Sequence, residues 1–251
     1  MKKIVVLVTF LLALSGCQKV VDNNDSSKTT SSSSYSEKQK QSKITKESQE
    51  EKMKTYPAES LLKAVETKDL NEVNAILKDK SYKIDEQNDQ GETPLFIATH
   101  DNQVDIAKAL IMAGADVNVQ DHIQDSPYLY AGAQGKTEIL KFMIQNAKPD
   151  QKVYNRYGGN TLIPAAEKGH LETVKVLLAD GSVDIDHQNK FGYTALIEAV
   201  ALRDGSKVYQ DIVKELLQYG ANKTLRDNDG KTAADYAREL GYVELQKILK
   251  D

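Results

Sequence analysis

Histidine is the first residue type in this sequence whose chemistry could define a site. The chain has four histidines. Imidazole is the commonest metal ligand in proteins, and in one familiar zinc motif two histidines stand four residues apart on one helix. Here the histidines are spread along the chain without ligand spacing, at His100, His122, His170 and His187. We therefore predict no metal site.

Paired aspartates are the second candidate for chemistry. Two carboxylates can share general acid and base work, and Asp184 with Asp186 and Asp227 with Asp229 are such pairs. Both pairs lie in segments that read as turns, where aspartate bonds the backbone two residues further on. The sequence also has no G-x-S-x-G and no Walker phosphate loop. We predict no catalytic residue and no cofactor.

Cys17 is the only cysteine, so an intrachain disulfide is excluded. It follows a basic start and an apolar run from Ile4 to Leu14. That run is shorter than the ~20 residues of a membrane-spanning helix and is typical of a secretory signal. The string Leu14-Ser15-Gly16-Cys17 resembles a bacterial lipobox, in which cleavage leaves an acylated N-terminal cysteine. We expect lipidation of Cys17.

The elements that hold the remaining side chains follow from a unit of about 33 residues that recurs to the C-terminus. Its clearest signature is GETPLFIA at residues 91–98, and equivalent stretches begin at Gln124, Gly158, Gly192 and Gly230. The successive spacings are 33, 34, 34 and 38 residues. A fixed period in the range of 20 to 50 residues is typical of a solenoid. Solenoids present long surfaces, so binding is the leading function.

Each copy predicts the start of a helix that packs closely on its neighbours. One column holds side chains that can cap a helix N-terminus: Thr93, Ser126, Asn160, Thr194 and Thr232. Five residues later a column of small side chains allows close helix contact: Ala98, Ala131, Ala165, Ala199 and Ala237. The glycines that open four of the five signatures suit positive φ, and the remaining signature opens with Gln124. A second helix with apolar spacing follows in each copy.

The motif TPLFIA at residues 93–98 resembles the T-P-L-H-x-A core of ankyrin repeats. Residues 169–178 resemble their G-H-x-x-V-V-x-L-L-L segment, and GADVN at residues 114–118 matches their ending. The resemblance covers about 190 of 251 residues. It implies an all-α solenoid of stacked helix-turn-helix units with β-hairpin loops and about five to six repeats. It also implies a structural role for His170.

Three segments are predicted along the chain. Residues 1–16 form the signal peptide, and residues 17–56 form the acylated cysteine and a tether rich in Ser, Lys, Gln and Glu. Such a composition favours disorder, with a reach of roughly 35 Å. Residues 57–251 form the repeat domain. Its approximate repeats are 57–87, 88–120, 121–154, 155–188, 189–226 and 227–251.

Charge restricts the class of partner. Residues 1–56 contain 10 Lys and 6 Asp or Glu, which leaves 23 basic and 31 acidic residues from position 57 onward, a net charge of −8. Because binding to phosphates needs concentrated Lys and Arg, nucleic acid is not an expected partner. The same charge opposes direct adhesion of the repeats to anionic lipid. Attachment to a membrane is therefore left to the acyl chains on Cys17.

The predicted hairpin tips carry the partner-binding hypothesis. In successive copies the residue before the signature is Gln90, Ile123, Tyr157, Phe191 and Asp229. Three adjacent tips are thus apolar or aromatic, and a clustered aromatic surface indicates binding. Packing against the neighbouring hairpin is the alternative interpretation. The predicted partner-binding residues are Ile123, Tyr157, Phe191, Tyr193, Arg156 and Lys190.

These features predict a monomeric, lipid-anchored protein on the extracytoplasmic side of a bacterial cell membrane. It would bind a protein partner through its hairpin tips and concave face, without enzymatic activity. An inhibitor or immunity-type protein for a secreted or envelope enzyme is one alternative, and a hydrolase built on the repeat scaffold is another. A deep polar pocket with perturbed titratable groups would favour the hydrolase. A shallow groove with an aromatic strip would favour binding.

The lipid anchor is tested by the substitution Cys17→Ala. Two or three acyl chains bind a membrane far more firmly than one, and no other cysteine can carry them. We expect the variant to leave the membrane fraction after a carbonate wash, whereas the native chain stays. Retention of the variant would contradict the lipoprotein assignment.

Overall fold

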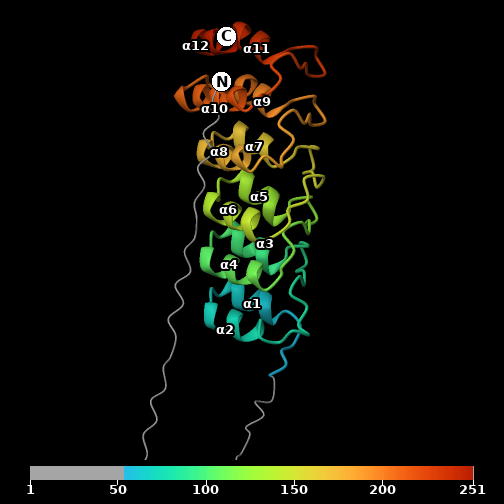
Figure 1. The fold of residues 1–251 in the computed structure, drawn as a ribbon. Coiled ribbons are helices and arrows are strands. Elements are labelled where there is room, and N and C mark those ends of the chain that lie inside the picture. The colour runs from blue at the N-terminus through green and yellow to red at the C-terminus, as the bar shows by residue number, and fades with distance from the viewer. Residues whose placement is uncertain (1–53, 251) are drawn as a thin grey trace, which may run out of the picture. The chain divides into compact units, whose positions relative to one another are not determined.

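The repeat region is a stack of helix pairs in the computed structural model, which describes residues 54–250. Twelve helices form six pairs in this part of the chain, stacked in chain order (Figure 1). The first helices of the pairs are α1 (Ser60–Glu66), α3 (Pro94–His100), α5 (Pro127–Ala133), α7 (Leu162–Glu167), α9 (Ala195–Ala201) and α11 (Ala233–Glu239). The second helices are α2 (Leu70–Ile76), α4 (Val104–Met112), α6 (Thr137–Asn146), α8 (Leu171–Asp180), α10 (Lys207–Gln218) and α12 (Val243–Lys250).

The N-terminal predictions fall outside this region. The signal peptide at residues 1–16, Cys17 and nearly all of the tether at residues 17–56 lie outside the described residues. In residues 54–250, none of the helices is long and apolar enough to cross a membrane.

Two rows of helices build the core. Each first helix contacts the first helix of the next pair, and each second helix contacts the next second helix. The apolar spacing read in the second helices points inward, because Val174, Leu177 and Leu178 of α8 are all buried. Ile212, Val213 and Leu216 of α10 are buried in the same way. A single continuous core results.

Side chains cap the first helices where the sequence predicts. The hydroxyls of Thr93, Ser126 and Thr194 each accept a hydrogen bond from the backbone N–H three residues on, at 3.1 to 3.2 Å. Thr232 forms a reciprocal capping box with Asp235. Although α7 begins one residue late, Asn160 Oδ1 still accepts from the N–H groups of its first two residues. These bonds satisfy donors that a helix start leaves free.

The alanine column is buried on the first helices, which contact one another from repeat to repeat. Ala98, Ala131, Ala165, Ala199 and Ala237 are each 0% exposed. We infer that these small side chains let successive first helices approach closely.

The loops between repeats are tight turns, and residues 54–250 contain no strand. The prediction of β-hairpin loops was therefore wrong in this respect. Each loop instead closes on itself through backbone bonds, such as Asn88 N–H to the Glu92 carbonyl at 3.1 Å, together with side-chain bonds. In the loop between α2 and α3, Asn88 Oδ1 accepts from the N–H groups of Gln90 and Glu92 at 3.0 and 2.9 Å. The same double acceptance recurs at Asp121, Asn155, Asn189 and Asp227.

Neighbouring loops are also tied to one another. Between three pairs of successive tips a single backbone bond forms, for example from Lys190 N–H to the Tyr157 carbonyl at 2.9 Å. Glutamine side chains add a second link, since Gln120 Nε2 donates to the carbonyls of Gln124 and Tyr154 at 2.8 Å each. Gln124 itself adopts a left-handed φ of 65°, the conformation that glycine holds in the other copies.

The longer fifth repeat extends both the turn and the helix after it. Residues 202–206 separate α9 from α10, whereas residues 134–136 separate α5 from α6, and α10 has 12 residues against 10 in α6. Tyr242 of the last repeat braces the longer turn by donating its hydroxyl to the Arg203 carbonyl.

The alanine column is tested by Ala165→Leu. The added carbons meet a fully packed contact, so we expect unfolding free energy to fall by about 1 to 3 kcal/mol in urea titrations followed by circular dichroism. Ala179→Leu, on the exposed side of α8, is the matched control and should change stability little. Equal curves for the two variants would show that the repeat register is wrong.

Candidate functional site

The predicted aromatic tips form one strip on the loops. Tyr157 and Phe191 are 50% and 53% exposed, and their ring centroids lie 6.4 Å apart. Phe191 in turn lies 6.3 Å from the ring of Tyr193, which is half-buried. Large aromatic rings with open faces are the usual anchors of protein interfaces.

The other predicted residues differ in how they join this strip. Arg156 holds its guanidinium 5.0 Å above the Tyr157 ring and reaches Asp125 at 3.2 Å. Lys190 donates its ammonium to the Arg156 carbonyl at 2.8 Å, so it braces two loops. Ile123 is 56% exposed on the preceding tip and does not line the pocket described next.

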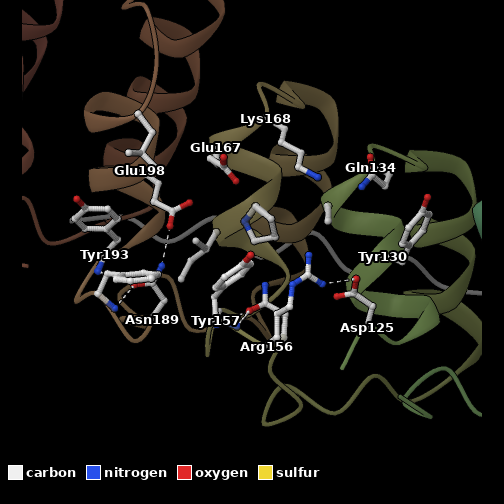
Figure 2. A pocket seen from close by; sticks show the side chains of 17 residues that line it. Asp125, Tyr130, Gln134, Arg156, Tyr157, Glu167, Lys168, Asn189, Tyr193 and Glu198 are labelled. Atoms are coloured by element: carbon white, nitrogen blue, oxygen red, sulfur yellow. Dashed lines mark hydrogen bonds and ion pairs between the residues drawn. The ribbon is translucent and has the colours of Figure 1, made fainter. Parts of the chain in front are cut away.

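A pocket of about 610 Å³ opens beside the strip, between the loops and the first helices of the third to fifth repeats. Figure 2 shows side chains from the loops and from the first helices converging on this pocket. The loops contribute Tyr157, Phe191 and Tyr193, and the helices contribute Tyr130, Pro164 and Glu198. The tip strip is thus one wall of a hollow on the inner face of the stack.

The helix side of this pocket was missed by the sequence analysis. The residue before each buried alanine forms a column whose members in the third to fifth repeats all face the pocket. The column consists of Ile97, Tyr130, Pro164, Glu198 and Tyr236. In each signature this column is the position directly before the alanine column, so the repeat alignment alone locates its residues.

Glu198 is the most perturbed group in the pocket. Its side chain is 7% exposed and accepts a hydrogen bond from Asn189 Nδ2 at 2.7 Å. Burial, with the nearby charge of Glu167, raises the pKa of Glu198 to about 7, although the Asn189 bond and Arg203 oppose the shift. Arg203 forms its ion pair with Glu167. Within residues 54–250 no cation pairs directly with Glu198.

The opposite end of the pocket carries a balanced set of charges. Burial raises the pKa of Asp125, while Arg156 and the more distant Lys168 act against that rise. Figure 2 shows Asp125 and Arg156 joined at this end, across Tyr157 from Glu198. The pocket therefore has one end with a direct ion pair and one end where, within residues 54–250, the Glu198 carboxylate has no direct ion pair.

The strip continues toward the last repeat through hydrogen-bonded tyrosines. Tyr193 meets Tyr236 edge to face at 6.2 Å, and their hydroxyls lie 3.3 Å apart. Tyr236 donates its hydroxyl to Asp227 Oδ2 at 2.6 Å. Burial and this bond raise the pKa of Tyr236. These contacts orient the Tyr193 ring within the aromatic wall of the pocket.

The residues considered for metal or acid–base chemistry are placed apart. In the described part of the chain, no three His, Asp or Glu side chains converge as metal ligands would. His187 Nε2 contacts the Gly158 carbonyl at 2.7 Å, and its ring stacks on Tyr154. Asp184 accepts from the Asp186 N–H at 3.1 Å and Asp227 from the Asp229 N–H at 2.9 Å. Both pairs are thus turn-forming.

Comparison with known proteins identifies similar chains. A family model described as ankyrin repeats (3 copies) matches residues 43–121, 114–189 and 162–251. The ankyrin repeat protein YahD of Escherichia coli (strain K12) is 39% identical over 197 residues, which are 78% of this chain and 96% of that protein.

Solved structures agree with these matches. The crystal structure of EF0377, an ankyrin repeat protein, aligns with a TM-score of 0.77 at 58% identity and covers 78% of this chain and 99% of its own. An ankyrin repeat domain from Acinetobacter baumannii AYE gives a TM-score of 0.74 at 46% identity, over 77% and 97%. The ankyrin repeat domain of Bcl-3 gives 0.69 at 27% identity, over 76% and 84%.

The Glu198 environment predicts a dependence of stability on pH. Its folded pKa of about 7 lies above the ordinary value of 4.5, so the folded state binds more protons between those values. Stability should therefore fall as pH rises from about 4.5 to about 7. Glu198→Gln keeps the acceptor for Asn189 without the charge. At pH 8 we expect the free energy of unfolding of this variant to be about 1 to 3 kcal/mol higher than that of the native chain.

Urea titrations at pH 5 and pH 8 provide the measurement. Glu66→Gln removes an exposed carboxylate from α1 and serves as the control, with little expected change at either pH. A native chain and a Glu198→Gln variant that lose stability in parallel would show that Glu198 is not the titrating group.

Proposed function

Because this chain belongs to the ankyrin-repeat family, we propose that its loop tips and inner face bind a specific protein partner. Ankyrin repeats are protein–protein interaction modules. The observation that carries the proposal is the strip of Tyr157, Phe191 and Tyr193 along one wall of an open pocket. Such rings lose little conformational freedom on binding and supply large contact areas.

The site is prepared for binding in its free form. The side chains of Asn155 and Asn189 accept the N–H groups of the tips that carry Tyr157 and Phe191. A backbone bond of 2.9 Å joins the first tip to Lys190 of the next loop. Because these loops are already ordered, a partner would pay little entropy to immobilise them.

We further propose that the module acts at a bacterial cell membrane, on the extracytoplasmic side, through lipid on Cys17. Support comes from the order of a basic start, an apolar run and the L-S-G-C string. Residues 17–56 would then form the acylated cysteine and the tether of the repeats, with a reach of roughly 35 Å from the anchor. The proposed partner is a protein exposed at this surface.

Inhibition or protection of a secreted or envelope enzyme is a special case of this proposal, in which the partner is that enzyme. The hydrolase alternative draws on one observation, the raised pKa of Glu198. A carboxylate pair would need a second free group, and the nearby Glu167 is engaged by Arg203. Binding therefore accounts for more of the site than hydrolysis does.

The double substitution Tyr157→Ala with Phe191→Ala tests the binding surface. Each removed anchor should cost about 2 kcal/mol or more in binding. Their combined loss predicts an affinity at least about a hundredfold weaker for the partner. The partner is first identified by crosslinking to the native chain in cells that encode it, and its affinity is then measured by calorimetry with purified proteins.

The melting curve of this double variant should stay close to that of the native chain, because both rings are about half exposed. Lys175→Ala is the control, because it lies on α8, a second helix that does not line the pocket. It should change neither the affinity nor the melting curve. Unfolding of the double variant would instead identify the rings as packing residues. Unchanged affinity in a folded double variant would place the interface elsewhere, beginning with the turn at residues 202–206.

A further inference from the structure

The chemistry of the pocket specifies one group of the partner, and this inference rests on the proposed function. The pocket has two ends that differ in charge. At one end Asp125 is paired with Arg156 at 3.2 Å, with Lys168 on the same side. At the other end Glu198 lies beside Asn189, and its charge is not matched by a direct ion pair within residues 54–250.

We propose that the Glu198 end of the pocket receives a cationic side chain, arginine or lysine, from the bound protein. Glu198 is only 7% exposed, so an ion pair formed there would be poorly screened by water. A buried carboxylate without an ionic partner is costly even when it accepts one hydrogen bond, and an entering cation offsets that cost. An entering carboxylate would meet repulsion from Glu198.

The aromatic wall suits the stem and the charge of such a group. Tyr157, Phe191 and Tyr193 line the same pocket as Glu198. Cations bind the faces of aromatic rings at about 6 Å or less from the centroid. The pocket contains an example, because the guanidinium of Arg156 lies 5.0 Å from the centre of the Tyr157 ring. A second guanidinium or ammonium that enters beside Glu198 would meet the rings of Phe191 and Tyr193, which line the same pocket.

The overall charge of the domain favours the same occupant. Residues from position 57 onward carry 23 basic and 31 acidic side chains, so the domain attracts positively charged segments. The ionisable and polar groups that face the Glu198 end come from α7, from the residues after α9 and from the loops. They are Glu167, Arg203, Tyr193 and Asn189. Glu167 adds to the negative potential and Arg203 partly offsets it.

Binding of a cation would be linked to protons. The pKa of Glu198 is about 7 in the free chain, and a cation beside the carboxylate would lower it. The occupant therefore binds more tightly at pH 8 than at pH 5.5, because at the lower pH a proton must first leave Glu198.

Two short peptides test this proposal with the full-length protein in detergent micelles. One is acetyl-Gly-Arg-Gly-amide, and the other carries citrulline, a neutral side chain of nearly the same shape, in place of arginine. Carboxyl resonances of carbon-13-labelled glutamate report both affinity and the pKa of Glu198. At pH 8 we expect the arginine peptide to bind at least fivefold more tightly and to lower the pKa of Glu198.

Variants separate this site from general attraction to an acidic protein. Glu198→Gln should reduce the preference for arginine to less than twofold, whereas Glu66→Gln, which removes an exposed carboxylate from α1, should keep it. Phe191→Leu retains apolar volume without an aromatic face and should weaken the arginine peptide severalfold. Each variant is checked for native circular dichroism, so a failure to fold is recognised.

Equal affinity for the two peptides, or a preference that survives Glu198→Gln, would overturn the inference. These results are independent of the tip variant. If Tyr157→Ala with Phe191→Ala loses the partner while the peptides bind equally, the binding function stands and the cationic group is wrong. If the peptides discriminate but the tip variant keeps its partner, the pocket binds cations and the proposed interface is wrong.

Discussion

The close contact between neighbouring first helices is the constraint on which the rest of the structure depends. Alanine occupies it in five successive repeats, and every one of these methyl groups is fully buried. Because a small buried side chain stands at this position in each of these repeats, successive first helices pack on one another, and loops that are 34 residues apart in sequence lie side by side. This spacing brings the Tyr157 and Phe191 rings to 6.4 Å and closes one wall of the pocket. The candidate site is therefore a product of the stack rather than of any one repeat.

The loops add rigidity to this spacing. An asparagine or aspartate three residues before each signature accepts two N–H groups of its own loop, so the tip keeps its shape without a strand ladder. With the polar backbone satisfied inside the loop, the tip residue is left to face outward. Tyr157 and Phe191 can then carry large apolar surfaces at positions that are held in place, which lowers the entropy cost of binding.

The fold could be predicted from the sequence because its columns contain residues of one kind with one physical role. Thr93 and Ser126 both cap a helix, and Ala131 and Ala165 both fill a tight contact. The tips could be located by the same register. The same register also locates the inner-face column, but its members differ in type, from Pro164 to Glu198 to Tyr236, so no shared chemistry marks the column as part of a site. Their common feature is their position relative to the pocket, which depends on how α7 and α9 lie against the loops.

Glu198 shows how stability and binding compete at this position. The equivalent residues of other repeats include Ile97 and Pro164, which bring no buried charge, whereas Glu198 stays only 7% exposed with a pKa near neutrality. Departures from the local rules of packing are expected at functional sites, and other parts of the fold compensate for the stability that is lost there. This departure lies beside the exposed aromatic strip and not at either end of the stack. If the pocket receives a cation as we propose, the Glu198 carboxylate destabilises the free protein and stabilises the complex. Stability would then depend on the partner, and this one group would couple folding, proton binding and recognition.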